Sequence, residues 1–156
     1  MELPEEQRHV DDLPTGTLMR IIYSVMVGKE ERGMAAAGYG DVHVAHFAVL
    51  LRLLTSPGGS RTTDLAAWAR ITKPSMIYLI NDLEEHGYVE RLPDPLDKRA
   101  QSVRLTARGR AAAQVIRELN RQVEQSWARS LDVQKVERFK LLLRELAESL
   151  HEWEED

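Results

Sequence analysis

Cysteine is absent from the sequence. Its absence excludes disulfides, thiolate zinc sites, cysteine nucleophiles and the sensing of peroxide through a thiol. No apolar run approaches the roughly 18 residues that a membrane-spanning helix needs. The first twelve residues are too acidic and polar for a secretory signal. We therefore expect a cytoplasmic protein.

Sequence motifs of catalysis are lacking as well. The chain contains no G-x-S-x-G, no P-loop and no H-E-x-x-H, and it shows no evident pair of buried carboxylates. We therefore predict that the protein is not an enzyme and needs no cofactor.

The charge of the chain is unevenly distributed. The 156 residues carry a net charge of −4, which by itself argues against a nucleic-acid partner. Residues 91–110, however, hold six basic and two acidic side chains. A polyanion would therefore meet this middle segment rather than the ends of the chain.

Four longer segments carry apolar residues at helical spacing. Their stripes are Leu18, Ile22, Val25 and Met26; Val44, Phe47, Ala48, Leu51 and Leu54; Val115, Ile116, Leu119, Val123 and Trp127; and Val136, Phe139, Leu143, Leu146, Leu150 and Trp153. We expect Asp41, Thr106 and Asp132 to begin the last three helices. The last stripe alternates spacings of three and four, which is typical of a seam for another helix.

Two short helical patterns lie between these segments. The first covers residues 62–70, and the second begins at Thr72, an N-cap residue, tolerates Pro74 in its first turn and ends at Gly87. Because only Ile71 separates the two, the pattern predicts a helix-turn-helix.

The periodicity then changes from helix to strand. Residues 88–92 and 101–105 each alternate apolar and polar side chains, which predicts a β-hairpin. Its tip, residues 93–100, is rich in proline and charge. The expected fold is therefore mainly α with one small β-hairpin.

A helix-turn-helix followed at once by a hairpin is a winged helix, and here the sequence resembles the MarR family of bacterial transcription regulators. The most specific stretches are Leu83-Glu84-Glu85-His86-Gly87-Tyr88-Val89-Glu90-Arg91, Asp94-Pro95-Leu96-Asp97-Lys98-Arg99 and Leu105-Thr106-Ala107-Arg108-Gly109. The resemblance implies a DNA-binding lobe over residues 55–106, between dimerisation helices in residues 13–54 and 107–156. It also implies a homodimer on palindromic double-stranded DNA, and a small aromatic or phenolic effector.

Candidate DNA contacts lie on the second short helix, on the hairpin tip and at the start of the first short helix. They are Lys73, Pro74, Ser75, Ile77 and Tyr78; Asp97, Lys98 and Arg99; and Arg61, Thr62 and Thr63. Each group also has a plainer interpretation, as an ordinary amphipathic helix, a solvated charged turn or a helix N-cap.

Arg99 is the central residue of the wing hypothesis. Its planar, permanently charged guanidinium suits a narrow, electronegative minor groove, and the resemblance implies that role. Asp97 is placed to hold it by an ion pair, and Lys98 adds attraction for phosphate. The sequence departs from the family pattern at Ile77 and Tyr78, so no base preference is carried over from relatives.

Residues for an effector pocket are less distinctive. They are Tyr23, Tyr39, His43, His46, Phe47, Arg52 and Trp68. His46 and Arg52 could pair a carboxylate, but a hydrogen-bonded buried His46 and a surface Arg52 are the favoured interpretation. His43 and His46 are also spaced for a shared metal, but with Asp41 they make too few evident ligands, and we predict no metal.

A second class of function stays open at this point. The predicted recognition helix has one basic residue, Lys73, against Asp82, Glu84 and Glu85. A winged helix so poor in positive charge is also compatible with a protein–protein adaptor that binds no DNA.

Overall fold

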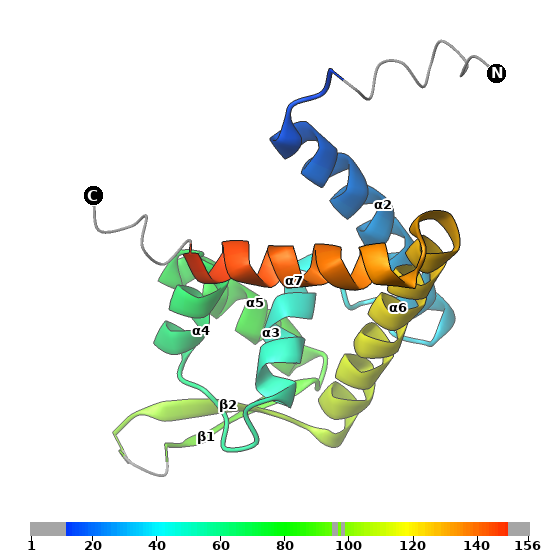
Figure 1. Cartoon of the computed structure of the whole chain (residues 1–156). Coiled ribbons are helices and arrows are strands. Elements are labelled where there is room, and N and C mark those ends of the chain that lie inside the picture. The colour runs from blue at the N-terminus through cyan, green and yellow to red at the C-terminus, as the bar shows by residue number, and fades with distance from the viewer. Residues whose placement is uncertain (1–11, 95–96, 98, 150–156) are drawn as a thin grey trace, which may run out of the picture. The chain divides into compact units, whose positions relative to one another are not determined.

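The structure is a computed structural model that describes residues 12–94, 97 and 99–149. These residues are mainly helical with one two-stranded antiparallel sheet, which confirms the predicted fold class (Figure 1). The elements are α2 (Thr15–Ala36), α3 (Val44–Leu54), α4 (Thr62–Ala69), α5 (Lys73–Glu85), β1 (Val89–Pro93), β2 (Gln101–Leu105), α6 (Ala107–Leu131) and α7 (Val133–Ser149). By their internal contacts they form two compact units, one up to Leu119 and the other from Asn120 onward.

Helices α4 and α5 form the predicted helix-turn-helix. Arg70, the C-cap of helix α4, has a left-handed backbone (φ 53°) that turns the chain. Only Ile71 then separates it from Thr72, the N-cap of α5. The hydroxyl oxygen of Thr72 then accepts the backbone N–H of Ser75 at 3.3 Å, as expected of an N-cap. Gly87 follows the far end of α5 with φ 76°, a conformation that favours glycine.

One face of α5 is part of the hydrophobic core. Met76, Ile80 and Leu83 are buried against residues of α3, α4 and α6, and Leu79 is half-buried. Burial of this face is the main stabilising contribution to so short a helix. It leaves the opposite face, which carries Ile77 and Tyr78, exposed to solvent.

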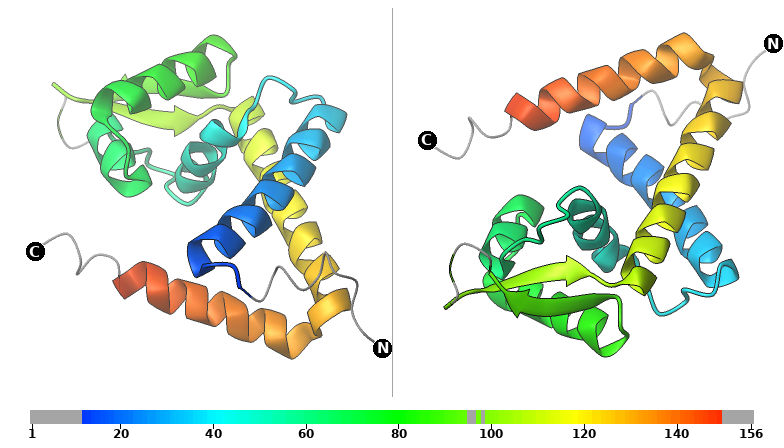
Figure 2. Two further views of the ribbon diagram at one scale, coloured as in Figure 1. Left: turned by 90° about the horizontal axis from the view of Figure 1, so that it is seen from above. Right: turned by 90° about the horizontal axis from the view of Figure 1, so that it is seen from below.

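The hairpin pairs Val89 with Leu105 and Pro93 with Gln101, and Figure 2 shows its two strands side by side. Ser60, just before α4, exchanges both backbone hydrogen bonds with Val103 of β2 at 3.0 and 2.8 Å. Ser60 therefore ties the start of the helix-turn-helix directly to the wing.

The predicted cap at Asp41 is wrong. Helix α3 begins at Val44, and its N-cap is His43, whose backbone N–H donates to Nδ1 of His46 at 3.1 Å. Asp41 has another role, because its carboxylate accepts the hydroxyl of the buried Tyr88 at 2.6 Å and an Nη2–H of Arg108 at 3.3 Å. Long-range partners therefore displace the local cap that the sequence pattern indicates.

The second unit pairs the end of α6 with α7. Val123 and Val136 are buried, and the rings of Trp127 and Phe139 pack edge to face with their centres 6.2 Å apart. Asp132 caps α7 as predicted, accepting the backbone N–H of Lys135 at 2.9 Å. Leu150 and Trp153, the end of the predicted seam, lie outside the described residues.

None of the helices in the described part of the chain is both long enough and apolar enough to cross a membrane.

Candidate nucleic-acid interface

The N-terminal half of α5 presents the side chains that the sequence selected for this helix. Lys73, Pro74, Ser75, Ile77 and Tyr78 are all exposed, and Tyr78 most of all at 72%. A half-buried helix with an exposed N-terminal half is the geometry with which a helix-turn-helix enters a major groove.

Two of the three acidic residues of α5, Asp82 and Glu84, contact other elements of the fold. Asp82 Oδ2 lies 3.0 Å from Nε2 of His46 on α3. Its neighbour Glu84 forms an ion pair with Arg91 of β1, and the same guanidinium donates from Nη2 to Oδ1 of Asn81 at 2.6 Å. The negative charge that the sequence sets against Lys73 is therefore partly neutralised within the fold.

His46 is a buried histidine with both ring nitrogens engaged. Since Nδ1 accepts the backbone N–H of His43, the ring proton lies on Nε2, from which it is donated to Asp82. Burial lowers the pKa of His46, and Asp82 opposes this only in part. The contact joins the N-terminus of α3 to the recognition helix.

The wing is organised by two carboxylates. Asp94, only 7% exposed, accepts from Nε of Arg61 at 2.7 Å. Asp97 Oδ1 accepts the backbone N–H of Arg99 at 3.0 Å. We expected Asp97 to hold the Arg99 guanidinium; within the described residues the carboxylate holds the backbone of Arg99 instead.

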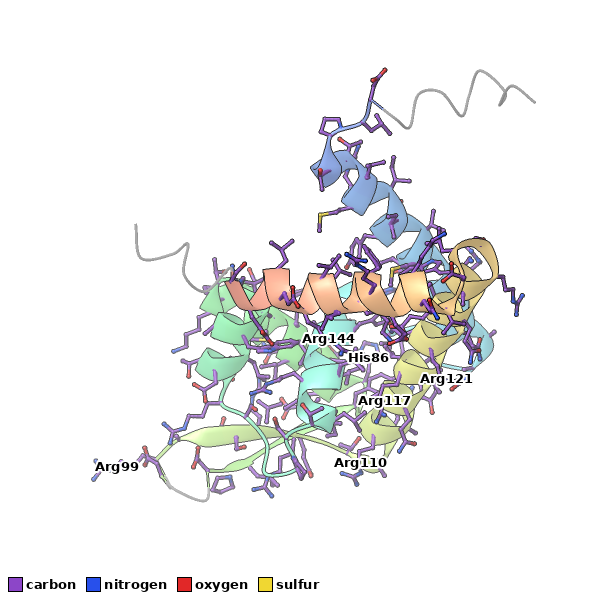
Figure 3. All side chains as sticks on the ribbon, in the orientation of Figure 1. His86, Arg99, Arg110, Arg117, Arg121 and Arg144 are labelled. Atoms are coloured by element: carbon purple, nitrogen blue, oxygen red, sulfur yellow. The ribbon has the colours of Figure 1, made fainter. Side chains whose placement is uncertain are left out.

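Arg99 lies at the outer end of the hairpin, where its side chain points away from the helices (Figure 3). The side chain is exposed to solvent. Lys98, the other basic residue predicted for the tip, lies outside the described residues.

The start of α4 faces the same region. Its N-cap is Arg61, whose side chain makes no cap hydrogen bond, and the hydroxyl of Thr63 lies 3.4 Å from its neighbour Asp64. Side-chain capping, the plainer interpretation of this segment, is therefore not what Arg61 does. First-turn N–H groups at such a helix end attract anions.

An open groove of about 680 Å³ joins these parts. It is lined by Arg61, Thr62, Thr63, Lys73, Ile77, Arg91, Arg99, Ala100 and Gln101. Of the described residues that line it, four are basic and none is acidic. Because Arg61 and Arg91 are paired with carboxylates, the positive potential that the groove offers a polyanion comes mainly from Lys73 and Arg99. Pro74, Ser75 and Tyr78 lie on the same helix but outside this lining.

Arg91 is a functional candidate that the sequence reasoning did not select. It falls in the family-like stretch, but alternation on a strand does not show that its side chain reaches across to α5. The available signal was the excess of basic over acidic side chains in residues 91–110, the segment that Arg91 begins.

The candidates for an effector pocket fall into small groups. The guanidinium of Arg52 lies 5.8 Å from the ring centre of the exposed Trp68, and the rings of His43 and His46 lie 6.0 Å apart. Phe47 is buried in the core, whereas Tyr23 is exposed on α2. Tyr39 packs against the core with its ring centre 6.2 Å from that of Tyr88.

A metal centre finds no support in the described residues, among which no group of three or more histidine, cysteine, aspartate or glutamate side chains is arranged so that it could hold a metal ion. His43 and His46 instead make the cap contact and the hydrogen bond to Asp82 given above.

The fold and the groove define a winged helix-turn-helix protein. A sequence model of the MarR family matches residues 41–100. The HTH-type transcriptional repressor Rv2887 of Mycobacterium tuberculosis (strain ATCC 25618 / H37Rv) is 31% identical over 103 residues, which are 66% of this chain and 71% of the relative. The chain belongs to the MarR family of transcriptional regulators, whose members are not enzymes.

Solved structures agree with this assignment. A crystal structure of MarR aligns with a TM-score of 0.78 and 23% identity over 99% of this chain and 98% of that chain. The Rv2887 protein in complex with DNA aligns with a TM-score of 0.65 and 27% identity over 86% and 98%. The same protein has been crystallised with salicylic acid, and that structure aligns with a TM-score of 0.65 and 28% identity over 88% and 98%.

Proposed function

We propose that this chain is a sequence-specific DNA-binding repressor that acts in the cytoplasm as a homodimer on palindromic operators. The observation that carries the proposal is the groove between α5 and the wing, where every charged side chain among the described lining residues is basic. The similarity to a repressor that was crystallised with DNA supports it.

In the proposed complex, each element of residues 55–106 has its own task. The exposed half of α5, with Lys73, Pro74, Ser75, Ile77 and Tyr78, reads base edges in the major groove. Arg99 enters the adjacent minor groove, and Lys98 adds attraction for phosphate. The N-terminus of α4, with Thr62 and Thr63, binds phosphate through its backbone.

Dimerisation is proposed for the segments 13–54 and 107–156. Both carry large apolar side chains that the chain leaves exposed: Met19, Ile21, Ile22, Tyr23 and Val25 on α2, and Val133, Leu141, Leu142, Leu143 and Leu146 on α7. Apolar surface of this extent is typical of an interface, and a second copy would cover it symmetrically. Sedimentation at micromolar concentration should give the mass of two chains, and a mass near one chain would contradict the dimer.

We further propose that a small aromatic or phenolic compound modulates DNA binding. The support is the complex of the Rv2887 protein with salicylic acid. Tyr23, His43, His46, Phe47, Arg52 and Trp68 remain the candidate contacts. A thermal-shift screen of such compounds, repeated on the Arg52→Ala variant, tests the idea, because specific binding raises the unfolding temperature.

Titration of a fluorescent duplex from the region upstream of the gene tests DNA binding. Affinity should fall steeply with salt, because each neutralised phosphate contributes a slope of about −0.9 in a plot of log K against log salt. Lys73→Gln should reduce the slope, whereas Lys135→Gln, at an exposed position on α7, should not. A salt-independent or absent interaction would favour the protein–protein adaptor.

A further inference from the structure

The base of the wing contains a connected set of hydrogen bonds that starts on α4. Arg61 donates from Nε to Oδ2 of the buried Asp94 at 2.7 Å, and its Nη2 lies 4.0 Å from Oδ2 of Asp97. Asp94 in turn accepts the backbone N–H of Asp97 through Oδ1 at 3.2 Å. The guanidinium therefore holds Asp94 directly, and Asp97 mainly through Asp94.

The same hydrogen bonds continue to the residue that reaches outward. The backbone N–H of Asp94 donates to the carbonyl of Ala100, and the N–H of Ala100 donates to the carbonyl of Asp97, both at 2.9 Å. Asp97 Oδ1 then accepts the N–H of Arg99. The backbone of Arg99 is thus fixed relative to α4 through Asp94 and Asp97.

We propose that Arg61 is a positioning residue, which fixes the wing to the start of α4 so that Arg99 is already placed relative to the recognition helix before DNA arrives. This inference rests on the proposed function and deepens it. Without the contact, Asp97, Arg99 and Ala100 must be ordered during binding, and the lost conformational freedom reduces affinity.

The surroundings of Arg61 disfavour direct recognition of phosphate by its side chain. Its Nε is occupied, and a phosphate drawn to the guanidinium would approach the carboxylates of Asp94 and Asp97. Repulsion between the like charges offsets the attraction. The hydrogen bond with Asp94 also raises the pKa of Arg61, so the side chain remains charged in this arrangement.

The two possible roles of Arg61, positioning of the wing and binding of phosphate, predict different effects of its replacement by lysine. The contact with Asp94 uses the Nε–H of a planar fork, which lysine lacks, whereas a phosphate accepts a lysine ammonium readily. If Arg61 positions the wing, Arg61→Lys and Arg61→Gln should both lose operator affinity, about tenfold, the scale of one charge-assisted hydrogen bond. Near-wild-type affinity for Arg61→Lys would overturn the proposal.

A double-mutant cycle with Arg99→Ala gives a second criterion. Because a positioning residue acts through Arg99, Arg61→Gln should cost little further affinity once Arg99 is alanine. Arg61→Gln alone should keep the wild-type salt slope, whereas Arg99→Ala should reduce it by about one. Additive losses together with a reduced slope for Arg61→Gln would identify a phosphate contact and reject positioning.

Hydrogen exchange on the free dimer separates this inference from DNA binding itself. In Arg61→Gln and Asp94→Asn, the amides of Asp97, Arg99 and Ala100 should exchange at least several-fold faster, while those of Ile80 and Leu83 in α5 keep their protection. Unchanged exchange at the wing contradicts the proposal even if the protein binds DNA. Conversely, failure of the wild type to bind DNA would reject the proposed function. Faster exchange at the wing in the two variants would still establish that the Arg61–Asp94 contact orders the wing.

Discussion

Replacement of His46 by phenylalanine tests whether a buried histidine holds the recognition helix. The ring, 3% exposed, accepts the His43 N–H on one side and donates to Asp82 on the other. Phenylalanine keeps most of the volume and removes both hydrogen bonds. Each bond contributes about 0.5–1.5 kcal/mol, and the His43 N–H is left without the ring as its partner. We therefore expect a loss of about 2–3 kcal/mol in the free energy of unfolding.

Urea unfolding at pH 7.5, followed by far-UV circular dichroism, measures this loss. His46→Gln is the matched control, because its amide can still donate toward Asp82, and it should lose less stability than the phenylalanine variant. If His46→Phe unfolds within 0.5 kcal/mol of wild type, the two contacts do not support the helix as argued.

The pH dependence of this loss has a defined sign. Burial lowers the pKa of His46 in the folded protein, whereas the unfolded residue titrates near 6.5. The unfolded state therefore binds more protons below that pH, and the stabilisation from the neutral ring, full above about 6.5, is lost as pH falls. The pKa of His86 is raised by its hydrogen bond with the backbone carbonyl of Asp82. Because His86 is present in both wild type and His46→Phe, its own titration does not set the difference between them. The difference between wild type and His46→Phe should thus narrow from pH 7.5 to 5; a constant difference would contradict a neutral buried ring.

Further substitutions test the interface and its support. Arg99→Ala should weaken operator binding at least tenfold without changing the sedimentation mass or the unfolding midpoint; unchanged affinity in the same titration would remove the wing from the interface. Tyr78→Ala should alter the preference among operator variants more than the overall affinity, and a uniform loss across unrelated duplexes would make Tyr78 a phosphate contact. A Cβ on Gly109 would overlap the backbone carbonyl of Tyr88, so Gly109→Ala should cost about 3 kcal/mol in urea unfolding. Gly16→Ala, where the added Cβ meets no atom within 4 Å, should be neutral or slightly stabilising.

Local patterns were enough to predict the order of the elements. Thr72, Pro74 and Gly87 mark the start and end of α5 through backbone chemistry that acts over a few residues, and the structure retains all three roles. The change from helical to alternating spacing located the hairpin to within one residue of β1. Asp41 shows where this reasoning stops, because its partners Tyr88 and Arg108 are far away in the sequence.

The candidate site was predicted less completely, for a related reason. Exposure on α5 follows from periodicity, so Lys73, Ile77 and Tyr78 could be selected from sequence alone. The roles of Arg61 and Arg91 depend on which carboxylates the fold brings to them, and Asp94 and Glu84 are 33 and seven residues away. No local pattern encodes such pairs.

Side-chain contacts within the fold also bear on the low positive charge of the recognition helix α5. The adaptor alternative was based on three acidic residues, Asp82, Glu84 and Glu85, against Lys73, but Glu84 is paired with the guanidinium of Arg91. Charges paired at short range contribute little field at the distance of a DNA backbone, whereas Lys73 and Arg99 lie in a groove whose lining, as far as the structure describes it, contains no acidic residue. The potential that a polyanion meets is therefore more positive than the sequence composition of α5 indicates. Disruption of the Arg91–Glu84 pair by Arg91→Gln should weaken DNA binding, because the negative charge of Glu84 is then left uncompensated.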